Sequence, residues 1–319
     1  MSWRRTLFFL FILISLAVFY YFKLYEQPKI NSFSSFSTEP TQSHILETNN
    51  QEAVKRLSIQ DDSKRTTISF EKDSTNQWQI ISPVSFPAEP LIVDGLVTLL
   101  KLSPKSRALS LTGLDLKDFG FARPRLKICV GVTSAHKDRC LLIGSQSAIG
   151  EGAYAKWENE NIYFLVEPAF LKSFDKTLYA VRKKQIFNLL NDEIKSIHFQ
   201  SSKKEIEIIY QNKQWMLKKP LKAAIAPETM DPLLTELSGL YVKEFLDDQT
   251  KSDLSSKFNQ AARTIQVIFQ NGSEQVLIQG SEANGWDAFY ARLNKPETIF
   301  LVSRGKLNKI EEIFSKLGS

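Results

Sequence analysis

The chain has 319 residues, 43% of them hydrophobic, and its 41 basic and 35 acidic residues give a formal net charge of +6. This length allows two domains of ordinary size. The small basic excess does not indicate a nucleic-acid-binding surface, so we expect no nucleic-acid partner. Two cysteines and three histidines are too few and too far apart to frame a metal site, so we expect no metal and no cofactor.

The first 25 residues have the pattern of an uncleaved signal anchor. Residues 6–22 carry no charge and would form a transmembrane helix of about 26 Å, which is at the short end for crossing a membrane. Arg4 and Arg5 precede this run and hold the amino terminus in the cytoplasm. A cleaved signal peptide is the alternative, but bulky residues occupy positions 19–22, where a peptidase requires small ones. We therefore expect a single-pass protein of the bacterial inner membrane, with the bulk of the chain periplasmic or extracytoplasmic.

Residues 26–65 are rich in Ser, Thr, Gln, Asn and Glu, which indicates a flexible tether. Within this segment, Val54, Leu57 and Ile59 could share one face of a short helix between residues 51 and 59.

The rest of the chain contains an internal repeat. Seven residues between Trp78 and Leu100 recur 137 positions later, so that Trp78 matches Trp215. A second block recurs at a shift of 136, where Gly144 matches Gly280. Identities this dense favour a duplicated module. We place the first module, with its connector, at residues 66–190 and the second at 191–319.

Periodicity and turn residues predict the elements of each module in chain order. In the first module we expect strands at 67–70, 78–81, 107–111, 125–133, 139–144, 154–157 and 162–166, helices at 90–102 and 167–176, and a helical turn at 114–119. A connector follows at 178–190. In the second module we expect strands at 194–199, 205–210, 264–270 and 274–280, an amphipathic helix at 227–240 and a terminal helix at 305–317. Each module is thus predicted to be α+β, an antiparallel sheet with packed helices.

The two cysteines lie on successive predicted strands. A hairpin folded about residues 134 and 135 places Cys129 opposite Cys140, close enough for a disulfide. A one-residue slip in the loop would separate them, so both outcomes remain open at this point.

Several short motifs follow one another in a fixed order. They are Trp78 with Pro83, the apolar helix to Leu102, Phe119-Gly120-Phe121-Ala122-Arg123-Pro124, Ile143-Gly144, Tyr154-Ala155-Lys156 and Arg182-Lys183-Lys184. This order resembles a bacterial family known as domain of unknown function 4340, closely over residues 66–190 and loosely over 194–315. Phe121 departs from the family outline, which has an aliphatic residue there. The resemblance implies a membrane-anchored companion of gliding-type ABC transporters, and it carries over no activity and no catalytic residue.

Candidate site residues each have a structural interpretation that we favour. Trp78 and Trp215 are expected to anchor the cores, and Asp94 and Asp231 to occupy first helical turns. Four further candidates point to one face of two corresponding strands, as alternate residues of any strand do. They are Tyr154 and Lys156 in the first module and Tyr290 and Arg292 in the second. The basic clusters, 182–184 and Lys218 with Lys219 and Lys222, would attract lipid head groups or cell-wall polymers but are expected to be solvated faces. The histidines, at positions 44, 136 and 198, are scattered, and residues 144–152 are glycine-rich without a phosphate-binding lysine.

We therefore predict no catalytic, cofactor-binding or metal-binding residue and no enzymatic activity. The expected function is that of a membrane-anchored structural or adaptor protein that binds an envelope or inner-membrane protein, such as an ABC-type transporter complex. The alternative is an envelope enzyme or ligand-binding protein with a pocket between the two modules.

Overall fold

The computed structural model describes residue 3 and residues 43–47, 53–109, 115–133, 137–148, 152–189, 193–247, 254–259, 263–295 and 298–317. His44–Ser319 form one compact unit. The predicted anchor lies outside the described residues, apart from Trp3, as does most of the predicted tether. In the part of the chain that is described, no helix is both long and apolar enough to cross a membrane.

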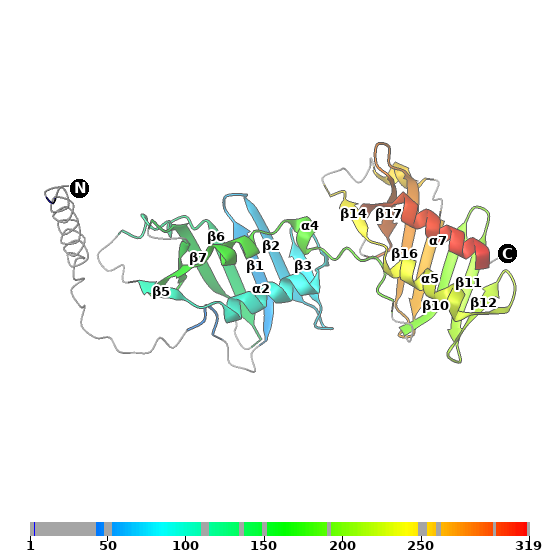
Figure 1. Cartoon of the computed structure of the whole chain (residues 1–319), viewed down its shortest axis with the longest axis horizontal. Helices are drawn as coiled ribbons and strands as arrows, with labels where there is room; N and C mark the ends of the chain where they lie inside the picture. The colour runs from blue at the N-terminus through cyan, green and yellow to red at the C-terminus, as the bar shows by residue number, and fades with distance from the viewer. Residues whose placement is uncertain are drawn as a thin grey trace. The chain divides into compact units, whose positions relative to one another are not determined.

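The first module is built on an antiparallel sheet, which has nine strands among the described residues (Figure 1). Across the sheet they are β4 (Phe86–Pro87), β3 (Trp78–Ser82), β2 (Thr66–Lys72), β1 (Val54–Asp61), β6 (Leu126–Val132), β7 (Arg139–Gln146), β8 (Ala153–Trp157), β9 (Tyr163–Val166) and β5 (Ser106–Leu109).

The second module has a sheet of the same strand order, again with nine described strands. These are β13 (Ala223–Ile225), β12 (Gln214–Lys219), β11 (Glu205–Gln211), β10 (Ile194–Ser201), β15 (Arg263–Phe269), β16 (Glu274–Glu282), β17 (Ala288–Leu293), β18 (Ile299–Ser303) and β14 (Val242–Phe245). Trp78 and Trp215 lie in corresponding strands, β3 and β12, each next to the short strand at the edge. The structure is therefore α+β, with two antiparallel sheets and few helices.

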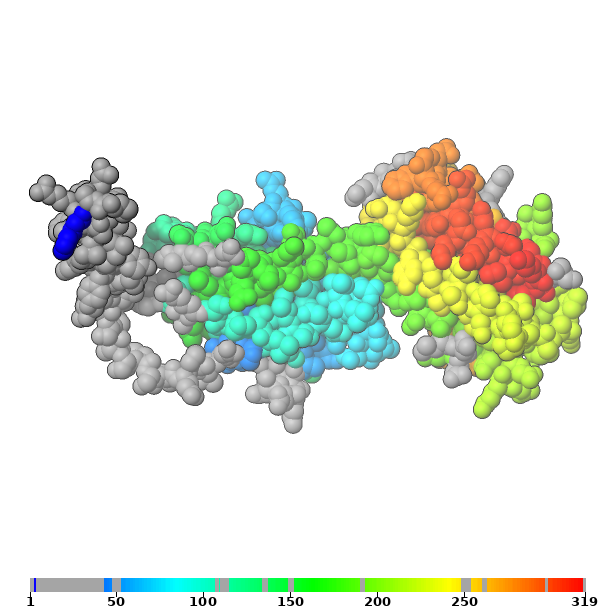
Figure 2. All heavy atoms as spheres, viewed as in Figure 1, coloured from blue at the N-terminus to red at the C-terminus, as the bar shows by residue number. Residues whose placement is uncertain are grey.

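Corresponding helices, α2 (Pro90–Leu102) and α5 (Pro227–Ser238), follow the edge strand of each sheet. Both begin with proline, which fits the first turn because its missing N–H would have no partner there. The remaining described helices are α3 (Pro168–Phe174), α4 (Leu178–Val181), the 3₁₀ turn η2 (Ser256–Phe258) and α7 (Arg304–Leu317). Figures 1 and 2 show α7, in red, beside α5, in yellow, over one face of the second sheet.

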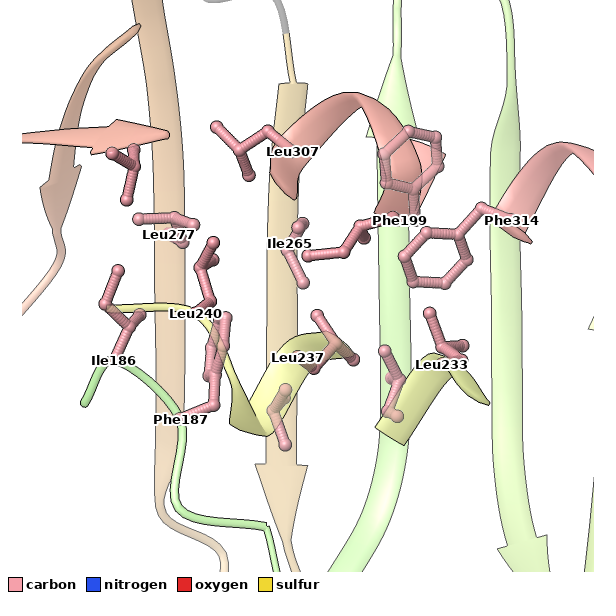
Figure 3. Close-up of a cluster of buried hydrophobic side chains, with 14 of the residues drawn as sticks. Ile186, Phe187, Phe199, Leu233, Leu237, Leu240, Ile265, Leu277, Leu307 and Phe314 are labelled. Atoms are coloured by element: carbon pink, nitrogen blue, oxygen red, sulfur yellow. The ribbon is translucent and has the colours of Figure 1, made fainter. Parts of the chain in front are cut away.

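The core of the second module lies between these helices and the sheet (Figure 3). Phe199 of β10 stacks on Phe314 of α7, with ring centroids 4.5 Å apart. On α5, the buried Glu236 carboxylate accepts hydrogen bonds or ion pairs from Lys306 and Lys309 of α7, at 2.9 and 2.6 Å. Hydrogen bonds from these two ammonium groups lower the pKa of Glu236. The two ion pairs link α5 to α7 beside the apolar core.

The predicted tether is wrong from Val54 onward, because Val54–Asp61 forms β1 in the middle of the first sheet. Leu57 and Ile59 are buried at the two-residue spacing of a strand, and β1 pairs with β2 on one side and β6 on the other. The predicted helix at 51–59 is wrong for the same reason. Where a helical turn is predicted at 114–119, residues 116–122 form a run of hydrogen-bonded turns, and residue 114 lies outside the described residues.

A second part of the predicted tether also packs on the first module. The Ile45 and Leu46 side chains are buried, and their backbone N–H groups donate to Ser103 and Leu100 at the end of α2. The indole N–H of Trp157 donates to the Ile45 carbonyl at 3.0 Å. The module therefore extends upstream to residue 45, well before the predicted boundary at residue 66.

Of the two outcomes that the sequence left open for the cysteines, the structure has the paired one. Cys129 of β6 lies directly opposite Cys140 of β7, with Cα atoms 4.0 Å apart, and the two form a disulfide. The register without a slip is the one adopted, so the bridge closes a hairpin loop with a sequence separation of 11 residues.

We predict that replacing both Cys129 and Cys140 by Ala lowers the free energy of unfolding of the first module by about 2–3 kcal/mol, because the unfolded chain loses a short covalent loop. Urea unfolding of the full chain, with and without reductant, measures the change. Equal midpoints in both conditions, together with full alkylation of both thiols in protein isolated without reductant, would contradict it.

Candidate functional site

Asp94 and Trp78, both considered from the sequence, bind each other. The Trp78 indole N–H donates to the Asp94 carboxylate at 2.7 Å, which fastens β3 to α2. The predicted first-turn positions are wrong, because Asp94 and Asp231 each lie one turn further into a helix that begins at Pro90 or Pro227. The Lys72 ammonium lies 4.9 Å from the centre of the Trp78 ring and 3.9 Å from the same carboxylate. In the second module, Trp215 packs against Tyr210 with ring centroids 4.8 Å apart. Both tryptophans are buried, as expected for core anchors.

The strand residues Tyr154, Lys156, Tyr290 and Arg292 make packing contacts. Tyr154 meets Phe119 edge to face at 4.9 Å, and Lys156 lies 5.5 Å from the Tyr163 ring. In the second module Tyr290 faces Lys257 and Arg292 lies over Phe258, at 5.5 and 4.9 Å.

The repeated glycines Gly144 and Gly280 explain why these rings come so close. A Cβ atom at Gly144 would lie 2.0 Å from the Phe119 carbonyl oxygen, and one at Gly280 would lie 2.5 Å from that of Lys257. Only glycine lets the preceding loop approach the strand to this distance. The repeated motifs therefore serve loop-to-strand packing.

The histidines are not brought together. His44 pairs with Pro104 through the backbone, and His198 lies on β10 beside Ser196 and Glu207. His136 lies outside the described residues. Among the residues that are described, no three His, Cys, Asp or Glu side chains are grouped to hold a metal ion.

The basic cluster at 218–222 is partly neutralised by the neighbouring strand. Lys218 binds Glu207 and Lys219 binds Glu205, each at 2.7 Å. The Lys218 hydrogen bond is the main cause that lowers the pKa of Glu207. This region is therefore a face of ion pairs rather than a continuous anion-binding surface.

The other basic cluster, 182–184, divides into a buried and a surface part. Arg182 is 1% exposed, and both terminal nitrogens of its guanidinium bind the Asp247 carboxylate after β14. The Phe86 and Phe245 rings flank the guanidinium at 5.4 and 4.4 Å. A buried cation requires such pairing, because water no longer solvates it.

Backbone hydrogen bonds hold the connector on both sides of Arg182. The Lys183 N–H donates to Pro87 at 2.9 Å, and the Ile186 N–H donates to Leu240 at 3.0 Å. The Val242 N–H donates to Lys184 at 2.8 Å. The predicted connector is therefore an ordered element, paired with the start of β14.

A surface of aromatic and lysine side chains surrounds this pairing. We call it the connector surface and define it as Tyr179, Lys184, Tyr241, Lys243 and Trp286. The aromatic residues are 39%, 54% and 51% exposed for Tyr179, Tyr241 and Trp286. Exposed Tyr and Trp are enriched at protein interfaces, where they contribute large contact areas at low entropy cost.

The lysines of the connector surface lie against its rings. The Lys184 ammonium is 4.7 Å from the Tyr179 ring, and the Lys243 ammonium is 6.0 Å from the Trp286 ring. The Tyr179 hydroxyl donates to the Lys243 carbonyl at 3.3 Å. Partial burial lowers the pKa of Lys184, whereas Glu89 acts in the opposite direction. The arrangement can offer rigid apolar faces together with positive charge.

Sequence reasoning missed Asp247 and the three exposed aromatic residues. The sequence shows a basic cluster at 182–184, but no periodicity separates its buried Arg182 from its neighbours. Asp247 lies 65 positions along the chain from Arg182, and only the fold brings them together.

Residues 78–262 match the family model described as domain of unknown function (DUF4340). The chain belongs to this family. The match begins at Trp78 in the first module and ends at residue 262, after β14 of the second module. It therefore includes both Arg182 and Asp247. No curated protein and no solved structure matches the chain.

We predict that Arg182→Ala lowers the free energy of unfolding by about 3–5 kcal/mol, because it leaves a cavity and an unpaired carboxylate. The conservative Arg182→Lys should also destabilise, since one ammonium cannot replace the two-pronged contact. The neighbouring Lys183→Ala is the control and should change the value by less than about 0.5 kcal/mol. Urea unfolding of the full chain measures all three, and an Arg182→Ala variant as stable as the control would contradict the assignment.

Proposed function

We propose that this DUF4340 protein is a membrane-anchored, extracytoplasmic adaptor that uses the connector surface to bind an envelope or inner-membrane protein. The observation that carries the proposal is the set of three exposed aromatic rings, held by an ordered connector and interleaved with lysines. Rigid aromatic anchors with surrounding charge are typical of protein interfaces. The positive charges favour a partner with an acidic face.

The proposed location is the outer side of the bacterial inner membrane. The predicted anchor at residues 6–22, preceded by Arg4 and Arg5, supports it, as does the cross-strand disulfide Cys129–Cys140. Structural disulfides are characteristic of oxidising compartments. The resemblance to companions of gliding-type ABC transporters makes such a complex the partner we propose first.

The burial of Ile45 and Leu46 against the first module shortens the predicted tether to residues 26–42. A flexible tether over residues 26–42 would span on average roughly 20–25 Å, from about 5–6 Å × √17. The adaptor would then act close to the membrane, beside a complex embedded in it.

We further propose that the two modules are copies of one ancestral module. The repeated residues and the common strand order support this interpretation. The two modules differ in some features: the exposed Trp286 and Tyr241 belong to the second module, and the disulfide belongs to the first.

The catalytic alternative has less support. Asp94, Tyr154 and Tyr290 make contacts that fasten strands to helices and loops. A ligand-binding role is the second candidate function, because a polar cleft lies at one end of the second module. In the part of the chain that is described, this cleft is lined by the connector and the second module rather than by both modules.

We predict that the double substitution Trp286→Ala with Tyr241→Ala reduces partner capture at least about tenfold, because it removes the two most exposed rings of the connector surface. The full chain is crosslinked mildly in intact cells, and captured envelope proteins are quantified by mass spectrometry.

The matched control is Ile162→Ala with Leu221→Ala, which removes two apolar side chains that are each 54% exposed elsewhere. The control should capture as much partner as the wild type. Equal loss in both variants, or no envelope protein enriched by the wild type over a variant that lacks the anchor, would contradict the proposal.

A further inference from the structure

The helix α2 of the first module carries apolar residues on two opposite faces. The residues that it buries in the core are Val93, Leu96, Val97 and Leu100. We call the opposite face the α2 face and define it as Leu91, Gly95, Thr98 and Leu102. These residues follow one another at spacings of three and four, so they form one stripe along the helix. Figure 2 shows α2, in cyan, at the surface of the first module.

The two leucines of the α2 face are strongly exposed. Leu91 is 82% exposed, the highest value of any large hydrophobic side chain in the described part of the chain, and Leu102 is 65% exposed. They lie at opposite ends of α2, about 16 Å apart along the helix axis. No charged residue belongs to the stripe between them. The α2 face is therefore an apolar surface that gains free energy when it is covered.

The second module shows that the fold does not require such a face. At the shift of 137 that relates the two modules, Leu91 corresponds to Glu228 and Leu102 to Gly239. The helix α5 thus has no leucine at either position, yet its sheet has the same strand order. Packing within a module does not explain the exposed leucines, whereas binding to another helix does.

Gly95, in the middle of the α2 face, is not required by the fold either. A Cβ atom at this position would meet no other atom within 4 Å. Glycine is also among the least favourable residues inside a helix. On an exposed helix face, a glycine lets a second backbone approach closely. The α2 face therefore has the profile of a helix-packing site, with a recess between two leucines.

The charges beside the α2 face identify the second helix. Asp94 and Lys101 are the two charged residues of α2, and their spacing of seven places them on the same flank of the face. The contacts of Asp94 with Trp78 and Lys72 both use its Oδ1 atom, so Oδ2 remains available to accept from another cation. The Asp94 side chain is 57% exposed.

A second copy of α2 fits this pattern. When two identical helices pack antiparallel about a twofold axis, each flank of one helix faces the same flank of the other. If the axis passes near Gly95 and Thr98, Asp94 of each copy lies opposite Lys101 of the other, and the ion pair forms twice. Leu91 of each copy then lies beside Leu102 of the other. A lipid surface would need neither the glycine nor the matched charges.

We propose that the protein forms a twofold dimer in which the α2 faces of two copies pack antiparallel, with ion pairs between Asp94 and Lys101 across the interface. One pair of helices is small beside the roughly 1,000 Å² of a stable protein interface, so we expect a weak dimer that crosslinking can trap. The α2 face shares no residue with the connector surface, so the adaptor role and the dimer can fail independently.

Cysteine crosslinking of the full chain tests the dimer. The chain has two cysteines, which are bonded to each other, so Thr98→Cys introduces one free thiol near the proposed axis. The matched control is Thr235→Cys, at the corresponding exposed position of α5. Both variants are purified in detergent and oxidised with copper phenanthroline. Thr98→Cys should form at least about tenfold more covalent dimer than the control, because the interface holds its two thiols together.

Two further substitutions, each made in the Thr98→Cys chain, separate the interface from folding. Gly95→Leu fills the recess and should reduce crosslinking at least about tenfold. That variant should unfold at the same or a higher urea concentration, because leucine favours the helix and its Cβ meets no neighbouring atom. Lys101→Glu places like charges opposite each other and should also reduce crosslinking, whereas Lys101→Arg should retain it.

Three results would overturn the proposal. One is a yield of covalent dimer from Thr98→Cys no greater than from Thr235→Cys; quenching of a fluorophore on Thr98→Cys by spin-labelled phosphatidylcholine in vesicles would then assign the α2 face to a lipid surface. Another is undiminished crosslinking in the folded Gly95→Leu or Lys101→Glu variant. The third is that Thr98→Cys, oxidised in intact cells, joins a different protein instead of a second copy, which would assign the α2 face to a partner helix.

Discussion

A guanidinium group removed from water must be paired, and this constraint organises the middle of the chain. Arg182 is buried between two phenylalanine rings and satisfies its charge with Asp247. To bring Arg182 to Asp247, the connector must lie along the start of β14, where the Ile186 and Val242 amides form their hydrogen bonds. The rings and lysines of the connector surface are fixed as a consequence. Fixing aromatic side chains in advance lowers the entropy cost of binding a partner.

Much of the fold could be predicted from the sequence. Alternation located most strands within a few residues, and the proline positions located the starts of α2 and α5. The recurrence of Trp78 as Trp215 anticipated two sheets of one strand order. The symmetry of the hairpin about residues 134 and 135 offered Cys129 opposite Cys140 as one of two outcomes, and the structure has that one. These successes have a common physical basis, because each depends on interactions between residues close in the chain or on a periodic buried face.

The errors have a common cause as well. β1 carries charged and polar residues among its few apolar ones and resembles the polar segment before it, yet it is central because β2 and β6 pair with both of its edges. Ile45 and Leu46 are isolated apolar residues in a polar stretch, and their partners lie far along the chain. Trp157, which donates to the Ile45 carbonyl, is more than a hundred positions away. No local pattern contains that information. The same holds for Arg182 and Asp247, which lie 65 positions apart and meet only in the folded chain.

The account is tested most directly by hydrogen–deuterium exchange in the full chain, compared between the wild type and Asp247→Asn. If pairing with Arg182 orders the connector, the Ile186 and Val242 amides exchange faster in the variant, while amides of the β6–β7 hairpin keep their protection. Unchanged protection at Ile186 and Val242 would contradict the claim that this buried ion pair holds the connector and its surface in place.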